Sequence, residues 1–189
     1  MDKHWQRFGW GLIAFGLAAA IALLAQPPFD PNFYLAEATQ VLSQSAGTGS
    51  TATLQRFSAR LMGDAVIPVP AMTPASGAVG AVLNGNRLVV RGAFRRLTAP
   101  LRDYATDPLN PPNPNITSAI HIHRGNPQEN GPFLYALTVQ TATDGLVGTF
   151  GGEYTLSSEQ VQLLNSGNLY VDVHTRAFRG GELRGVLKG

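Results

Sequence analysis

The sequence predicts an all-β protein, an antiparallel β-sandwich or barrel, preceded by one N-terminal transmembrane helix. Three observations support this fold class. Glycine (21 residues) and proline (13) are plentiful and only 14% of residues are charged, which is typical of short strands joined by turns. From residue 53 onward, short stretches of alternating polar and apolar residues follow one another at regular spacing. The N-terminal residues instead form a long apolar run without charge.

The chain contains no cysteine. Disulfide frameworks, thiolate zinc sites, iron–sulfur clusters, cysteine nucleophiles and blue-copper centres are therefore excluded. The sequence also lacks a nucleophile elbow, a phosphate-binding Walker loop, an HExxH motif and a dinucleotide-binding fingerprint. We therefore do not expect the protein to be an enzyme.

Residues 1–29 are expected to form the membrane anchor. Lys3 and Arg7 precede an apolar run that extends over residues 8–25 and would be about 27 Å long as a helix, enough to span a bilayer. Because the basic residues precede the run and the acidic Asp30 follows it, we expect a cytoplasmic N-terminus and a C-terminal domain on the other side of the membrane.

The apolar run allows two further predictions. Its small residues would let another transmembrane helix pack closely against it in lipid. These residues are Ala14, Gly16, Ala18, Ala20 and Ala22. In the alternative interpretation the run is a cleaved signal peptide, with residues 18–20 as the small-residue cleavage site.

Residues 30–52 are expected to form a short amphipathic helix and a flexible linker. Asp30 is a suitable N-cap, and Pro31 fits the first helical position, where no amide donor is needed. Apolar residues then recur at helical spacing, and the linker follows over residues 45–51. This helix would lie on lipid headgroups or on a partner, or it would cover one end of the following domain.

Residues 53–189 contain the predicted strands. Asn84 and Gly85 form a strong hairpin signal between "SGAVGAVLN" and "RLVVRGAFRRL". A long proline-rich loop, "APLRDYATDPLNPPNPN", precedes "ITSAIHIH". Ser157 and Gln160 have the spacing of a capping box, which predicts a short helix that ends near Leu164.

Three histidines of this domain are candidate metal ligands. His121 and His123 share one face of a strand and are about 6.6 Å apart along it, so both imidazoles can reach one metal ion. His174 lies in a similar strand and shares its face with Asp172. Three imidazoles suit zinc or copper. Alternatively, the histidines only form hydrogen bonds to Asp172, to Glu182 or to loop carbonyl groups.

Two polar features complete the candidate sites. Glu182 and Arg184 of "GGELRG" share a strand face, so they would pair with each other or support a histidine. A set of arginines forms a predicted basic ridge that either contacts anionic lipid headgroups or an acidic partner, or remains solvated. The ridge consists of Arg87, Arg91 and Arg95, extended by Arg96 and Arg102.

The motifs "AIHIHRGNP", "GPFLYALT" and "LYVDVHTRAFRGGELRGVL", preceded by "FSARLMGDAVIPVP" and "SGAVGAVLNGNRLVV", resemble the CHRD (chordin-type) domain. The resemblance extends from about Gln55 to the C-terminus. It implies a β-sandwich that serves as a binding or interaction module, a type of domain widespread in exported bacterial proteins.

A more distant resemblance connects "HIHRG" and "LYVDVHT" to the copper-binding strands of copper/zinc superoxide dismutases. It implies an antiparallel Greek-key β-sandwich of the superoxide-dismutase or immunoglobulin type. His121, His123 and His174 would then occupy three of the four copper-ligand positions. The zinc-binding loop, the bridging histidine and the disulfide have no counterpart, so dismutase activity is not expected.

We therefore expect a non-catalytic accessory subunit, anchored by a single span in a bacterial inner (cytoplasmic or intracytoplasmic) membrane, with its domain in the periplasm. Its partners would be lipids and a larger membrane protein complex, such as a respiratory or photosynthetic reaction-centre assembly, and no nucleic acid. The first alternative is a periplasmic copper- or zinc-binding protein, with or without redox activity. The second is an extracellular adhesion or matrix-binding module.

Overall fold

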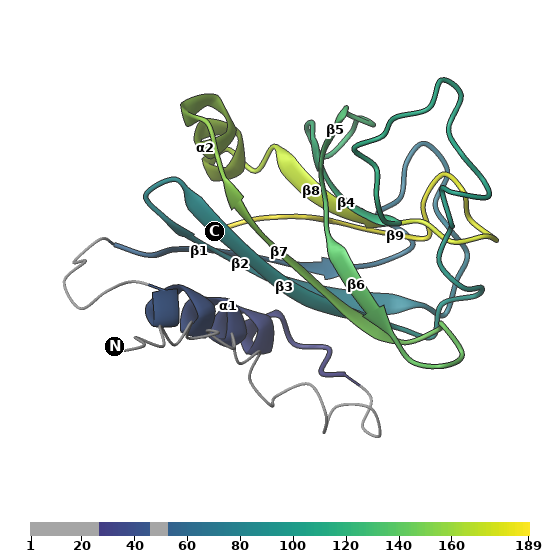
Figure 1. Ribbon diagram of the computed structural model, residues 1–189, viewed down its shortest axis with the longest axis horizontal. Coiled ribbons are helices and arrows are strands. Elements are labelled where there is room, and N and C mark those ends of the chain that lie inside the picture. The colour runs from purple at the N-terminus through teal and green to yellow at the C-terminus, as the bar shows by residue number, and fades with distance from the viewer. Residues whose placement is uncertain (1–26, 46–52) are drawn as a thin grey trace, which may run out of the picture.

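The computed structural model describes residues 27–45 and 53–189 (Figure 1). Most of the predicted anchor (residues 1–26), with its small-residue stripe of Ala14, Gly16, Ala18, Ala20 and Ala22, lies outside the described residues, as does most of the predicted linker. Within the described ranges, no helix has both the length and the apolar character needed to cross a membrane.

The strands form two antiparallel sheets that face one another (Figure 1). The five-stranded sheet contains, in spatial order, β1 (Gln55–Leu61), β2 (Ser76–Asn84), β3 (Arg87–Arg95), β7 (Gly148–Thr155) and β6 (Thr138–Thr141). The four-stranded sheet contains β5 (Phe133–Ala136), β4 (Ile120–Arg124), β8 (Leu169–Val173) and β9 (Leu183–Val186). The prediction of an all-β sandwich is confirmed.

The two sheets are connected at both edges. At one edge β5 and β6 are separated only by Leu137, whose side chain is fully buried where the chain passes between sheets. At the other edge two antiparallel bridges, Ser58 to Lys188 and Met62 to Arg184, connect β1 to the C-terminal segment. The hairpin between β2 and β3 turns at Gly85, as the sequence predicts, with a φ of 61°.

The main core lies between the sheets and follows the period-two alternation of the strands. Leu88, Val90 and Phe94 of β3 point into it and share this core with Ile120 and Ile122 of β4. Each of these side chains is at most 1% exposed. Burying a side chain of this size stabilises a fold by about 1.5–3 kcal/mol, so the inner faces of the strands supply most of the driving force for folding.

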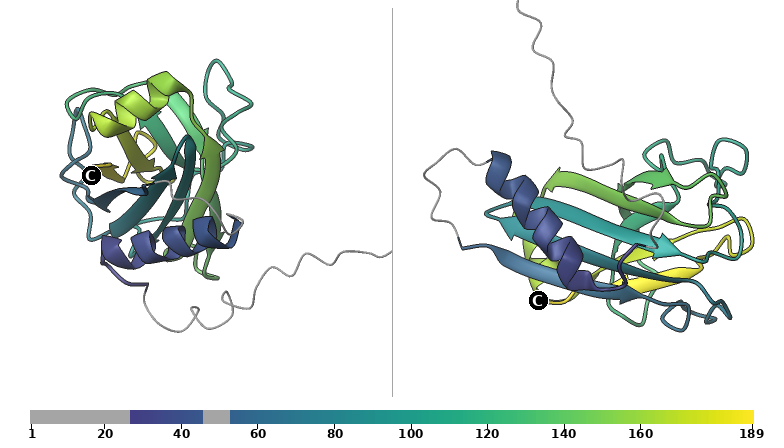
Figure 2. Two further views of the ribbon diagram at one scale, coloured as in Figure 1. Left: turned by 90° about the vertical axis from the view of Figure 1, so that its left-hand side faces the viewer. Right: turned by 90° about the horizontal axis from the view of Figure 1, so that it is seen from below.

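Helix α1 (Pro31–Ser45) covers the outer face of the five-stranded sheet, as both views in Figure 2 show. Tyr34, Ala38 and Leu42, spaced four residues apart, form its buried stripe. Gly80 of β2 permits the close approach, because a Cβ there would lie 2.3 Å from the backbone nitrogen of Leu35. The helix thus lies on a face of the sandwich and not at one end of it.

The start of α1 has the predicted capping arrangement. The Asp30 carboxylate accepts a hydrogen bond from the backbone N–H of Asn32 at 2.9 Å, and Pro31 is the first helical residue. Helix α2 (Ser158–Asn165) has the predicted capping box, with the Ser157 hydroxyl accepting from the Gln160 N–H at 3.2 Å.

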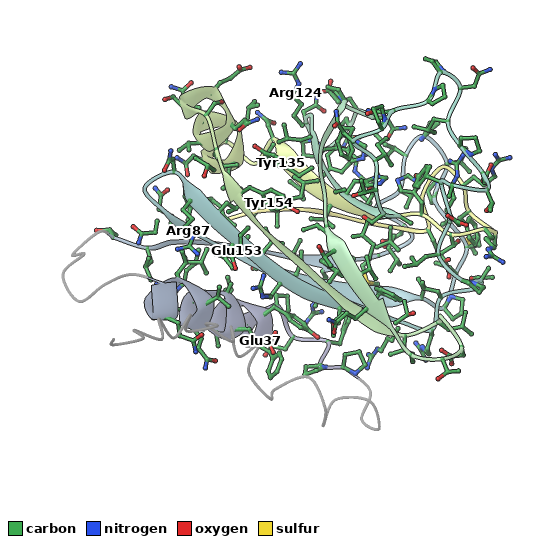
Figure 3. The ribbon with its side chains drawn as sticks, in the orientation of Figure 1. Glu37, Arg87, Arg124, Tyr135, Glu153 and Tyr154 are labelled. Atoms are coloured by element: carbon green, nitrogen blue, oxygen red, sulfur yellow. The ribbon has the colours of Figure 1, made fainter. Side chains whose placement is uncertain are left out.

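The arginines of β3 do not form a free basic ridge. Arg87 and Arg91 lie 2.6 and 3.5 Å from the carboxylate of Glu153 on β7, and Figure 3 shows Arg87 and Glu153 together near α1. Arg95 donates to the Ser76 hydroxyl and lies over the ring of Phe29. The sequence suggested a solvated or docking face, but α1 covers the residues between these arginines.

Of the two predicted extensions of the ridge, only one is at the surface. Arg96 follows β3 directly and is exposed, with a φ of 54°. Arg102 is only 9% exposed and lies against the loops beside the four-stranded sheet, where it pairs with Asp107 at 2.8 Å. Its placement on the ridge is therefore wrong, because the chain leaves the first sheet after β3 and crosses to the second.

Candidate metal centre

The pairing of β4 with β8 brings the candidate ligands together. These two strands are antiparallel neighbours, and their register places His121 opposite Asp172 and His123 opposite Tyr170. Because side chains alternate along a strand, the intervening apolar residues of both strands point into the core. The two histidines and Asp172 consequently share the outer face of the four-stranded sheet, and His174 joins them directly after β8.

The Asp172 carboxylate lies at the centre of the three imidazole rings. Its Oδ1 is 3.3 Å from Nε2 of His123 and 3.7 Å from Nδ1 of His121. Its Oδ2 is 3.1 Å from Nε2 of His174. One ligand atom from each of the four residues lies within 4.8 Å of the other three. The site is nearly enclosed, since these side chains are 2–14% exposed.

The other nitrogen of each ring faces a backbone carbonyl oxygen. Nδ1 of His123 lies 3.0 Å from the oxygen of Gly131, and Nδ1 of His174 lies 3.0 Å from that of Arg179. Nε2 of His121 lies 2.6 Å from the oxygen of Ser118. A carbonyl oxygen only accepts hydrogen bonds, so the nitrogen facing it carries the hydrogen in each ring. In a neutral imidazole the opposite nitrogen then presents a lone pair.

When all three imidazoles are neutral, the centre of the cluster therefore contains acceptors and no donor. Nε2 of His123, Nε2 of His174 and Oδ1 of Asp172 are buried and have no hydrogen-bond partner among the described residues. Leaving a buried polar group unpaired costs about 1–3 kcal/mol. A cation at the centre, either a metal ion or a proton, would remove this cost.

Burial and charge act in opposite directions on these groups. Burial lowers the pKa of His121 to about 4, although the Asp172 carboxylate partly opposes this shift. Burial also lowers the pKa of His174, but Asp172 outweighs burial and holds that pKa above its ordinary value. Burial raises the pKa of Asp172, yet the adjacent His174 and His123 outweigh it and hold that pKa well below the usual range. At neutral pH, His121 is therefore neutral and Asp172 is ionised.

Aromatic rings surround the cluster. The ring of Tyr170 stacks on that of His123, with centroids 5.1 Å apart and an interplanar angle of 7°. Tyr104 and Phe133 lie beside His121, with centroids 5.6 and 5.3 Å away. These rings lower the local polarity and restrict the orientation of the imidazoles.

Of the three residues predicted to support the histidines, only Asp172 contacts them. Glu182 is fully buried, and its Oε1 accepts from Thr73 and Thr98 at 2.6–2.8 Å. It connects β9 to the loops around β2 and β3, so its proposed contact with a histidine is wrong. Arg184 does not pair with Glu182 either. It lies over Tyr170 and donates to the loop between β4 and β5.

The alternative prediction that the histidines contact loop carbonyl oxygens is confirmed for one nitrogen of each ring, but the sequence did not indicate which carbonyl groups, because backbone groups carry no side-chain signal. Tyr104 was missed, because it lies in the proline-rich loop without a motif around it. The position of Tyr170 beside the cluster could have been predicted, because strand alternation places this residue on the same face as Asp172.

Comparison with known proteins gives one match. The family model of the CHRD domain matches residues 57–187, a range that begins in β1 and ends directly after β9. All four residues of the cluster lie within this range, whereas α1 precedes it. No curated protein and no solved structure matches the chain.

Proposed function

We propose that the chain, which belongs to the CHRD family of non-enzymatic domains, functions as a metal-binding protein. It holds one zinc or copper ion between His121, His123, His174 and Asp172. The observation that carries this proposal is the arrangement of the three imidazoles, each with one nitrogen against a backbone carbonyl oxygen and the other against the carboxylate of Asp172.

The spacing of the ligand atoms supports a metal ion. In a tetrahedral zinc site with bonds of about 2.0–2.2 Å, ligand atoms lie about 3.4 Å apart. The distances from the Asp172 oxygens to the imidazole nitrogens, 3.1–3.7 Å, are close to this value. Three imidazoles and a carboxylate are also a ligand set that Zn²⁺ and Cu²⁺ both accept.

The number of protein ligands favours retention of a metal over catalysis. Catalytic zinc sites usually keep a position open for water or substrate, whereas structural sites use four protein ligands. Here four side chains from the chain converge and are nearly enclosed. This arrangement supports a protein that binds and retains its ion.

Metal analysis tests the proposal. The full-length protein is loaded with Zn²⁺ or Cu²⁺ in separate samples, freed of unbound metal and analysed for bound ions. We expect one ion per wild-type chain with at least one of the two metals, and none in His123→Ala or Asp172→Asn. His4→Ala, which removes the fourth histidine of the chain, is the matched control and should keep the ion. A wild-type protein without stoichiometric metal would contradict the proposal.

A second candidate function concerns the membrane, and one contact favours it. The ring of Phe29 lies between the guanidinium groups of Arg60 and Arg95, 5.4 and 5.1 Å from its centroid. The chain is therefore bound to the domain close to where the apolar N-terminal segment ends. An inner-membrane anchor there would hold the domain near the periplasmic surface, as an accessory subunit of a larger complex requires. Purification in mild detergent as a free monomer would count against it.

We also propose a more specific fold assignment from the order of the strands. Strands β4, β5, β6 and β7 succeed one another, and β8 then returns to lie beside β4. This order supports a Greek-key sandwich of the superoxide-dismutase or immunoglobulin type. The adhesion or matrix-binding alternative has no comparable support among the described residues.

A further inference from the structure

Two buried arginines flank the histidine cluster, and each lies over a tyrosine ring that contacts a histidine. Arg184 is 3% exposed, and its guanidinium lies 3.7 Å from the ring centroid of Tyr170. Arg102 is 9% exposed and lies 4.6 Å from the ring centroid of Tyr104. Each arginine also binds a loop beside the cluster.

Arg184 holds the loop between β4 and β5. Its Nη1 donates to Oδ1 of Asn130 at 2.9 Å, and its Nη2 donates to the carbonyl oxygens of Glu129 and Asn126 at 2.7 and 3.3 Å. These acceptors are all neutral, so the guanidinium fork fixes the shape of this loop and does not balance a charge.

The same loop orients His123. The residue directly after the clamped segment is Gly131, whose carbonyl oxygen faces Nδ1 of His123 at 3.0 Å. The N–H of Gly131 donates to the Tyr170 hydroxyl at 3.0 Å, and the Tyr170 ring stacks on the imidazole. Release of the loop would therefore free the acceptor that fixes the His123 ring.

Arg102 acts in the same way on the other side of the cluster. Its Nη1 donates at 3.3 Å to the carbonyl oxygen of Arg179, which is also the acceptor for Nδ1 of His174. Its Nε lies 2.8 Å from the Asp107 carboxylate, and Arg179 pairs with that carboxylate as well. The backbone N–H of Arg102 donates to the carbonyl of His174 at 3.0 Å.

We infer that Arg102 and Arg184 control the exchange of metal at this centre by clamping the two loops whose carbonyl oxygens orient His174 and His123. The inference rests on the proposed metal site. Both arginines are positioning residues, since neither reaches the centre of the cluster. Groups that orient metal-binding histidines typically change metal affinity by about 10–100-fold when they are removed.

The direction in which the rate of metal release changes shows whether an arginine acts by holding a loop or only by its charge. A guanidinium close to a bound cation repels it, so removal of an arginine by its charge alone would slow metal release. Removal of a clamp has the opposite effect, because a histidine whose ring can rotate releases the metal sooner. Lysine keeps the charge but cannot form the planar fork that bridges several carbonyl oxygens.

The experiment uses the full-length, zinc-loaded protein and an excess of a chromogenic chelator, which reports zinc release over time. For Arg184→Gln and Arg102→Gln we expect release about 10–100-fold faster than from wild type. The corresponding lysine variants should also release zinc faster than wild type. The control is Arg87→Gln, which breaks an ion pair on the opposite sheet and should leave the rate unchanged.

Two further measurements exclude a merely structural effect. Thermal unfolding of the metal-free proteins should show that the variants remain folded, and the visible spectrum of the Co²⁺-loaded variants should depart from that of the tetrahedral wild-type site. If a glutamine variant does not fold, Asn130→Ala removes one acceptor of Arg184 and should still accelerate release.

The zinc-release experiment separates failure of the metal site from failure of the role of the two arginines. A wild-type protein that retains no metal contradicts the metal site itself. A wild-type protein that retains zinc, with glutamine variants that release it at the same rate or more slowly, overturns the role of the arginines and leaves the site intact.

Discussion

The outer faces of the two sheets are both covered, but by different means. On the five-stranded sheet, α1 covers small and apolar side chains such as Ala78, Val82 and Val89, and Gly80 lets the helix approach the strand. On the four-stranded sheet, loops cover the four residues of the histidine cluster, and Nε2 of His123, Nε2 of His174 and Oδ1 of Asp172 have no hydrogen-bond partner among the described residues. The first face is closed by apolar packing and by the ion pairs of Arg87 and Arg91 with Glu153, whereas the second leaves buried acceptor atoms without a hydrogen-bond partner. This difference supports a structural role for the first face and the proposed metal site on the second.

The largest expected effect on stability tests the packed face. In Gly80→Ala the new Cβ would lie 2.3–2.9 Å from backbone atoms of α1, which cannot move aside as a side chain would. We expect the free energy of unfolding to fall by about 3 kcal/mol, measured by urea denaturation. Gly180→Ala is the matched control, since nothing lies within 4 Å of a Cβ there, and should have little effect.

Gly80→Ala also separates the two faces. The zinc stoichiometry of the variant should remain that of wild type, because the helix contacts only the other sheet. Loss of zinc from a folded Gly80→Ala protein would show that the two faces are coupled and would contradict their independence.

The next largest expected effect is the stabilisation of the protein by zinc at the histidine cluster. Free Zn²⁺ at 100 times its dissociation constant should stabilise the wild-type protein by about 2.7 kcal/mol, since only the folded chain assembles the four ligands. In Asp172→Asn this increment should disappear, because the carboxylate contacts all three imidazoles. Urea denaturation with and without zinc measures both values. An equal increment in the variant would show that the metal binds elsewhere.

A smaller effect follows from proton competition. Nε2 of His174 must lose its proton to bind a metal, and the adjacent Asp172 raises the pKa of this group above its ordinary 6.5. Zinc affinity should therefore weaken by up to about tenfold for each pH unit below that raised pKa. The pKa of His121 is about 4, so this residue adds a second proton only in more acidic solution. A zinc affinity that is constant between neutral and mildly acidic pH would contradict the predicted weakening of binding at lower pH.

The predictability of the two faces from the sequence also differs. The helical spacing of its apolar residues predicted α1, and Pro31 correctly predicted its first residue. No pattern indicated which surface the buried stripe of Tyr34, Ala38 and Leu42 would cover. That surface includes Val82 and Val89, and the strand of Val89 was expected to present a solvated or docking face of arginines. The contact depends on Gly80, whose role appears only when the helix is in place.

On the polar face, the alternation in β4 correctly predicted that His121 and His123 share a side. Their meeting with Asp172 and His174 depends on the pairing of β4 with β8, strands about fifty residues apart in the sequence, for which a resemblance was the only guide. Arg102 was misplaced because the chain changes sheets between β3 and β4, and a change of sheet leaves no periodic signal.

X-ray absorption spectroscopy of the zinc-loaded protein can show whether three imidazoles and one carboxylate hold a single ion. We expect a first shell of three imidazole nitrogens and one carboxylate oxygen at about 2.0–2.2 Å. A shell dominated by water oxygens, or one that contains fewer than three imidazoles, would contradict it.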